Sequence, residues 1–538
     1  FTNIEISPCF CASSIKLRID EREDKSISIG STSNPALFIV WAIIAALFIL
    51  FFSLKRLPSR KQDIALEVQE LLKLYAAHPQ VTALDTLLKN DTSRNIFLKG
   101  LNGSGPAMTI ASLFTKGRGS YVCVLNDQEE AGYFYHDLMQ LTASNEVYFF
   151  PSAYRRAIKY GHVDPANEIL RTEVLSRLQD PDASFVIVTY PDALAERVVA
   201  REVLKENTLK ISVGEKLDNM FVSDVLDEYG FEQVDYVYEP GQYALRGSIL
   251  DVFSFSYEFP YRIDFFGDEV ETIRTFDVET QLSKEKLDSI YIVPEMSKNA
   301  KDSTSLLGSL PRNTFIAARD LAWCKERIGS VWNDDPVVAD EESFADIDQM
   351  RKKLVQAEDF LREVLDFRRI HFGARPMGTA DATIHFSTQT QPIYHKNFDR
   401  VSESFHKYLD EGYTLYILSD QEKQANRIRM IFEDRGDNIP FTAVNRTIHE
   451  GFADDTLRIC FFTDHQLFDR FHKFNLKSDK ARSGKITLSL KELNQFSQGD
   501  YIVHIDHGVG QFGGLVRTEV NGKMQEAIKL IYQNNDII

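Results

Sequence analysis

Cysteine and positive charge are both scarce in this chain of 538 residues. The five cysteines are scattered, which argues against a disulfide framework and suits a reducing compartment. The formal net charge of −18 argues against a surface that mainly binds nucleic-acid phosphates, because such a surface needs Lys and Arg in excess. Protein partners are therefore favoured. The length allows about three to five domains, since domains typically have ~100 to 200 residues.

The chain also lacks an intact P-loop sequence of the form GxxxxGK[ST]. A predicted strand, a glycine-rich loop and a helix follow one another around Gly100, and the loop includes Gly103 and Gly105. Pro106 stands at the Lys position and Ala107 at the hydroxyl position, so the groups that would hold phosphates and Mg²⁺ are missing. Pro106 also lacks a backbone N–H. We predict a degenerate P-loop that is kept for its fold, without nucleotide hydrolysis.

A β-meander is predicted within residues 238–280. The aromatic and branched runs that predict its strands are residues 248–253, 261–266 and 269–276. Side chains alternate along a strand, so Arg262 and Phe266 share one face, with Arg246 just before the first strand. Arginines and an aromatic residue in such a patch are typical of protein interfaces. The alternative is that Phe266 lies in the core and both arginines form solvated pairs with nearby acids.

The order of the other predicted elements indicates an α/β multidomain protein. A short strand is expected at 95–98, and buried parallel strands separated by helices are expected at 121–125, 147–150 and 185–189. After the β-meander the α/β fold is expected to resume, with a strand at 314–317, and residues 385–389 are expected to return a strand to the first sheet. A small separate α/β unit follows. After a polar linker, strands at 501–505, 511–519 and 526–532 with glycine turns predict a small β-barrel.

Catalytic and metal-binding patterns are weak. Asp464 and His465 follow a predicted strand, but no nucleophile accompanies them, so a loop cap is the favoured interpretation. His504 and His507 lie three apart with no cysteine nearby, which is a poor zinc pattern. Neither catalytic residues nor a metal site are predicted.

Two segments resemble a known family. ALRGSILDVFSFSYEFPYRIDFFGDEVETIRTFDVETQ resembles domain 2 of the bacterial transcription-repair coupling factors and of their relative UvrB. SQGDYIVHIDHGVGQFGGLVRTEVNGKMQEAIKLIYQNND resembles the RNA-polymerase-interacting domain of the coupling factors, which is shared with CarD-type regulators and has a Tudor-like barrel fold. The matches run in the family's order over about residues 63–538.

The resemblance implies a division of the chain into domains. The expected parts are a leader at 1–62, UvrB-like domains 1a and 1b at 63–206 and 295–390, an inserted antiparallel domain 2 at 207–294, domain 3 at 391–477, a linker at 478–488 and the polymerase-interacting domain at 489–538.

Two partners are implied as well. UvrA would bind at Arg246, Arg262 and Phe266. The β subunit of RNA polymerase would bind the strand formed by Leu515, Val516, Arg517, Thr518 and Glu519, in which Thr518 replaces a family residue that is often apolar.

The whole family protein is an ATP-dependent translocase on double-stranded DNA in the cytoplasm. It removes stalled polymerase and recruits UvrA for nucleotide excision repair. ATP and Mg²⁺ belong to a motor that this chain lacks, so no cofactor is expected here. The alternatives are a UvrB-like nucleotide-dependent DNA enzyme and a membrane-anchored adaptor.

The anchored alternative rests on residues 36–54, an uncharged apolar run of about the ~20 residues that span a bilayer. The first Met is Met108, and the family begins near VQELLKLYAAHP. We therefore expect residues 1–62 to be translated upstream sequence, and membrane association is not expected.

Overall fold

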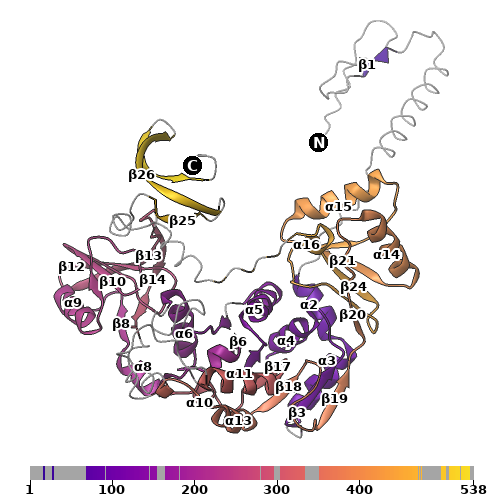
Figure 1. Ribbon diagram of the computed structural model, residues 1–538, viewed down its shortest axis with the longest axis horizontal. Helices are drawn as coiled ribbons and strands as arrows, with labels where there is room; N and C mark the ends of the chain where they lie inside the picture. The colour runs from indigo at the N-terminus through magenta and orange to yellow at the C-terminus, as the bar shows by residue number, and fades with distance from the viewer. Residues whose placement is uncertain are drawn as a thin grey trace. The chain divides into compact units, whose positions relative to one another are not determined.

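The computed structural model is shown in Figure 1. It describes residues 16–17, 27–28, 68–90, 93–144, 146–153, 164–180, 182–278, 280–295, 303–333, 351–470, 472, 474, 476, 499–504, 508–520 and 523–532. A short antiparallel pair, β1 (Lys16–Leu17) and β2 (Ile27–Ser28), forms part of a first unit, and residues 66–538 form a second. The apolar run at 36–54 and the linker at 478–488 lie outside the described residues. Within the described part of the chain, none of the helices combines the length and hydrophobicity that a membrane span requires.

A seven-stranded parallel sheet is the centre of the second unit. Its strands are β3 (Asn95–Lys99), β4 (Tyr121–Val124), β5 (Val147–Phe149), β6 (Val186–Thr189), β17 (Phe315–Ala318), β18 (Arg368–His371) and β19 (Ala382–His385), in the order β19-β3-β18-β17-β4-β6-β5. The apolar runs that predicted β3, β4, β5, β6 and β17 are buried, as expected for a sheet covered on both faces. Strand β18 was not predicted, because its sequence RRIH is not an apolar run. The expectation that residues 385–389 form the returning strand is wrong. That strand, β19, ends at His385, and residues 388–390 belong to another sheet.

Helices surround this sheet. They are α2 (Val68–Ala76), α3 (Pro79–Lys89), α4 (Gly105–Thr115), α5 (Gln128–Thr142), α6 (Pro165–Arg177), α7 (Pro191–Leu194), α8 (Arg201–Glu206), α10 (Leu306–Ser309), α11 (Leu321–Asn333) and α13 (Ala357–Leu365). Helices α2, α4 and α5 contact one another (Figure 1). The apolar face of α2 explains its position, since Leu71 and Tyr75 are fully buried in the core.

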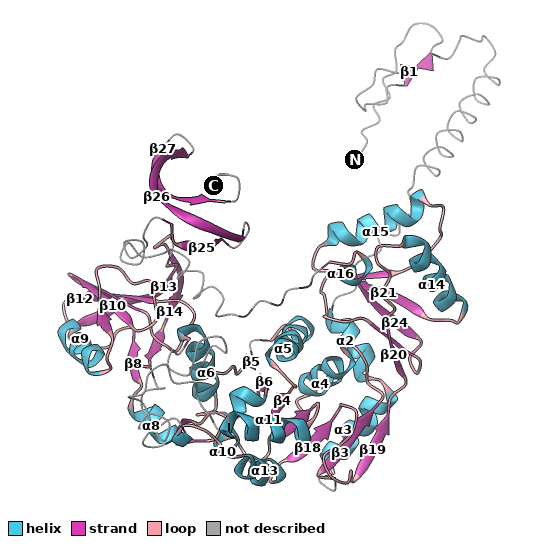
Figure 2. Cartoon of the chain, viewed as in Figure 1, coloured by secondary structure: helices cyan, strands magenta, loops and turns pink. Residues whose placement is uncertain are grey.

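An antiparallel sheet is inserted between β6 and β17. Its strands are β9 (Glu232–Gln233), β10 (Gln242–Arg246), β11 (Ile249–Val252), β12 (Tyr261–Phe266), β13 (Glu269–Phe276) and β14 (Ser283–Leu287), with only the β9–β10 pair parallel. Helix α9 (Asn219–Glu228) packs on one face of it (Figure 2). Two short antiparallel pairs connect the inserted sheet to the first core. They are β8 (Leu209–Ser212) with β15 (Ser289–Ile292), and β7 (Val198–Val199) with β16 (Ser303–Thr304). Arg246, which was expected before the first strand, instead ends β10.

A third sheet has the order β20-β23-β24-β21-β22. It contains β20 (Thr388–Thr390), β21 (Thr414–Leu418), β22 (Thr442–Val444), β23 (Phe452–Asp454) and β24 (Ile459–Thr463), with helices α14 (Phe398–Asp410), α15 (Glu422–Asp434) and α16 (Asp464–Leu467). One face has its own hydrophobic core. On the other face Phe452 and Phe461 join the core of the first sheet, where Phe452 packs edge-on against Tyr75. The expected separate unit therefore shares a core with the first sheet.

The last sheet is antiparallel and contains β25 (Tyr501–His504), β26 (Gly508–Val520) and β27 (Lys523–Ile531). Val520 pairs with Lys523, so β26 and β27 extend further toward each other than the predicted strands 511–519 and 526–532, and residues 521–522 between them lie outside the described part. Closure of these strands into a barrel stays a prediction. The broader expectation of a mixed α/β chain with several sheets is confirmed.

Candidate functional site

Strand β12 presents two different faces. Tyr261, Ile263 and Phe265 are buried, whereas the side chain of Phe266 is 79% exposed. This alternation confirms that Arg262 and Phe266 lie on the face opposite the core of α9. The alternative that Phe266 is a core residue is wrong. An aromatic ring left in water at the end of a rigid strand is available to a partner.

Asp251 fixes both arginines of this face. It lies on β11, is fully buried, and is the cross-strand neighbour of Arg262. Arg262 Nε donates to Asp251 Oδ1 at 2.7 Å and Nη2 donates to Oδ2 at 2.8 Å, while Arg246 Nη2 also donates to Oδ2. These hydrogen bonds raise the pKa of Arg262. The arginines therefore pair with a buried acid and are not merely solvated surface pairs.

The remaining guanidinium contacts hold each arginine in one orientation. Arg246 Nη1 donates to the Asp235 carbonyl at 2.7 Å, and its guanidinium lies 5.0 Å from the ring centre of Tyr236. Arg262 Nη1 donates to the Gln281 carbonyl at 3.2 Å, and its guanidinium lies 4.4 Å from the ring centre of Phe276. Groups that are already ordered lose little entropy on binding, so this face is preorganised for a partner.

The expected polymerase-contact strand lies within β26. Residues 515–519 pair with β27, whereas β25 pairs with residues 508–511 of the same strand. Among the described strands, the other edge of 515–519 is therefore open. Val516 is 40% exposed, and the side chains of Leu515, Arg517, Thr518 and Glu519 lie outside the description. An open edge offers N–H and C=O groups to another strand.

The glycine loop lies between β3 and α4, in the predicted order. Its backbone groups contact the segment that precedes β23: Ser104 N donates to the Glu450 carbonyl at 3.1 Å, and Glu450 N donates to Ser104 Oγ at 3.0 Å. Gly103 has a φ of +53°, and a Cβ on it would lie 2.9 Å from the Gly451 carbonyl oxygen. Protein backbone is thus packed against this loop.

A cavity of about 430 Å³ lies beside the glycine loop. Its acidic lining residues are Asp127, Glu129, Glu130, Asp137 and Glu450, and Arg319 is its basic one. Burial raises the pKa of the Asp137 carboxyl to about 7. Because five carboxyl groups and one arginine line this cavity, its lining disfavours an anionic ligand such as a nucleoside triphosphate.

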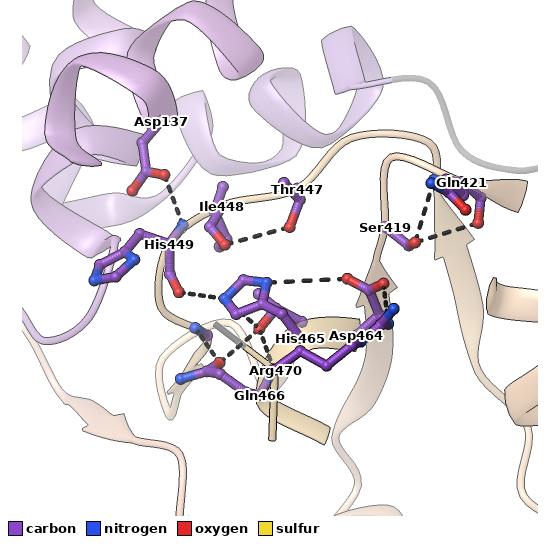
Figure 3. A network of polar contacts seen from close by, with 12 residues as sticks. Asp137, Ser419, Gln421, Thr447, Ile448, His449, Asp464, His465, Gln466 and Arg470 are labelled. Atoms are coloured by element: carbon purple, nitrogen blue, oxygen red, sulfur yellow. Dashed lines mark hydrogen bonds and ion pairs between the residues drawn. The ribbon is translucent and has the colours of Figure 1, made fainter. Parts of the chain in front are cut away.

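A polar network joins α5 to the residues around α16 (Figure 3). Asp137 accepts a hydrogen bond from His449 N at 2.6 Å, and the His465 ring contacts the His449 carbonyl at 2.8 Å. Burial lowers the pKa of His449 and of His465 to about 4, so both rings are neutral near neutral pH. Thr463 is the N-cap of α16, and Asp464 lies in the first turn. Asp464 and His465 therefore have structural contacts, although the cap residue itself is Thr463.

Sequence reasoning missed two features of these sites. One is Asp251, whose signal was an acid within an otherwise apolar strand run. The other is the contact between the glycine loop and Glu450, which joins residues 346 positions apart and leaves no local signal. Within the described part of the chain, no group of three His, Cys, Asp or Glu side chains is arranged to hold a metal ion.

Comparison with known proteins matches two parts of the chain to domain families. The UvrB interaction domain matches residues 209–297, and the CarD-like/TRCF RID domain matches residues 496–538. The transcription-repair-coupling factor of Staphylococcus aureus (strain bovine RF122 / ET3-1) is 23% identical over 542 residues, which cover 85% of this chain and 46% of the relative. That of Staphylococcus epidermidis is 23% identical over 517 residues, which cover 82% of this chain and 44% of the relative.

The fold and these matches define a mixed α/β protein with several sheets, two segments of which are similar to the UvrB interaction domain and to the CarD-like/TRCF RID domain. The chain is similar to the amino-terminal region of the transcription-repair coupling factors, which confirms the resemblance seen in the sequence. It spans about half the length of the curated relatives it matches.

Proposed function

We propose that this chain is the partner-binding region of a transcription-repair coupling factor that acts in the cytoplasm. It recruits UvrA through the inserted antiparallel domain and binds the β subunit of RNA polymerase through the carboxyl-terminal sheet. The match of residues 209–297 to the UvrB interaction domain and of 496–538 to the CarD-like/TRCF RID domain supports both assignments. In the whole protein, a motor that uses ATP on double-stranded DNA removes the stalled polymerase.

The observation that carries the UvrA assignment is the form of the face around Phe266. An aromatic side chain that is 79% exposed shares this face with two arginines fixed on a buried aspartate. Exposed aromatic and arginine residues on a rigid support are the usual anchors of protein interfaces. We assign Arg246, Arg262 and Phe266 as UvrA contacts.

This chain does not itself hydrolyse nucleotide in our proposal. Pro106 and Ala107 replace the cation and hydroxyl of a working P-loop, and the neighbouring cavity is lined mainly by carboxyl groups. Both observations oppose the UvrB-like enzyme alternative.

The test measures binding of purified UvrA to the full chain and to Phe266→Ala. Phe266 is largely exposed, so its truncation should leave the fold unchanged and weaken binding about 30-fold, equivalent to ~2 kcal/mol for an interface anchor. Ile393→Ala is the matched control, because Ile393 is a 71% exposed apolar side chain in the third sheet's domain. Equal affinity of Phe266→Ala and wild type would refute the assignment of this face.

A further inference from the structure

Exposed hydrophobic side chains are concentrated in the inserted domain. Among the described residues, large hydrophobic side chains with substantial exposure include Val213, Met220, Phe221, Tyr236, Tyr238, Phe266, Leu282 and Tyr291, which all lie in this domain. Single exposed hydrophobic residues are normal on protein surfaces, whereas a gathering of them marks an interaction surface.

Tyr236 adjoins Arg246 directly. The loop that carries it is held by the buried side chain of Val237, which packs with Ala244 and Phe276. The Arg246 guanidinium stacks over the Tyr236 ring at 5.0 Å, and the tyrosine remains 54% exposed. A ring that is ordered on one side and open on the other can bind a partner at low entropic cost.

Leu282 lies next to the turn that Arg262 contacts. Arg262 donates to the carbonyl of Gln281, and the turn is closed by Asp277 N donating to the Leu282 carbonyl at 3.0 Å. The Leu282 side chain is 68% exposed. The loop between β13 and β14 therefore has an exposed apolar side chain at the residue that follows the Arg262 contact.

We propose that Tyr236 and Leu282 are further contact residues of the UvrA-binding face, so that this face extends across the sheet from residues 235–236 to residues 281–282. The inference rests on the proposed function and deepens it. At the centre of the face Arg246 and Arg262 pair with the buried Asp251, and the Arg274–Asp264 ion pair lies beside them. Exposed apolar side chains lie in the loops on both sides, and Phe266 lies at the end of β12. This face therefore fits a partner surface on which a carboxylate group, for the arginines, is surrounded by apolar side chains.

The test compares UvrA affinity of the full chain with that of Tyr236→Ala and Leu282→Ser. Each variant should bind at least about fivefold more weakly, the effect of losing an ordinary interface contact. Tyr291→Ala is the matched control, since Tyr291 is 51% exposed in the same domain and also lies beside a cation, Lys210, but on β15. It should bind like wild type.

A double variant separates direct contact from positioning of Arg246. If Tyr236 contacts UvrA, adding Tyr236→Ala to Arg246→Ala should weaken binding further, whereas no further loss would overturn the contact role of Tyr236. Wild-type affinity of Tyr236→Ala and Leu282→Ser, with weakened binding by Phe266→Ala, would overturn this inference and leave the proposed function standing. Absence of UvrA binding by the unaltered chain would instead refute the proposed function.

Discussion

Truncation of Arg262 should destabilise the inserted domain as well as weaken its binding. Arg262 makes two hydrogen bonds to Asp251, whose side chain is fully buried. Breaking a buried ion pair by removing one partner typically costs about 3 to 5 kcal/mol, because the remaining charge stays buried. Arg246 still contacts Asp251 in the Arg262→Ala variant, so we expect the lower end, about 3 kcal/mol. Asp251→Asn in the same background should recover part of the loss.

Native-state hydrogen exchange of residues 249–266 is the suitable assay, because a multidomain chain does not unfold in two states. Tryptophan fluorescence would not report on this domain, since the tryptophans are Trp41, Trp323 and Trp332. A loss of about 3 kcal/mol corresponds to roughly 100-fold faster exchange of amides that open with the domain. Arg274→Ala is the control: its partner Asp264 is 21% exposed, and partly exposed pairs contribute only about 1 kcal/mol or less. Equal exchange in both variants would refute the structural role of the Asp251 pair.

Three other predictions concern the remaining sites. Isothermal calorimetry should detect no ATP binding to this chain, and micromolar affinity would contradict the degenerate loop. Burial raises the pKa of Asp137 to about 7, so the folded chain keeps a proton that the unfolded chain releases near its ordinary pKa of 3.8. The resulting loss of stability is complete above about pH 7 and absent well below about pH 4. Asp137→Asn should therefore raise the melting temperature more at about pH 8 than at about pH 5, and an equal rise at both pH values would contradict a raised pKa of Asp137. Thr518→Arg should abolish capture of the polymerase β-subunit lobe by the full chain, because a charge on a contact strand is costly to desolvate, and unchanged capture would exclude residues 515–519 as the contact.

The sequence predicted β3, β4, β5, β6 and β17, because a parallel strand covered on both faces is a short run of apolar residues. It missed β18, whose sequence RRIH is not an apolar run although it lies between β3 and β17. The outward face of β12 was equally predictable, since alternation follows from strand geometry alone. Strand β20 was assigned to the wrong sheet because its neighbour β19 ends only three residues earlier, and nothing local marks where one sheet stops and the next begins. Asp251 stands out in the sequence as an acid within an apolar run, but the sequence does not show which residues it pairs with. Its pairing with Arg246 and Arg262 follows only when β10, β11 and β12 are placed side by side.

The glycine loop shows why glycine spacing alone is a poor guide to nucleotide chemistry. In a phosphate site, glycines let the backbone approach an anion, and the loop N–H groups donate to it. Here the N–H of Ser104 donates to the Glu450 carbonyl, and Gly103 is required by the Gly451 carbonyl oxygen, 2.9 Å from where a Cβ would lie. The same small residues and the same N–H donors thus join the third sheet's domain to the first α/β core. A loop of this kind can lose its Lys and hydroxyl residues and still need its glycines, because packing against another segment of the chain imposes the same steric limit as a phosphate.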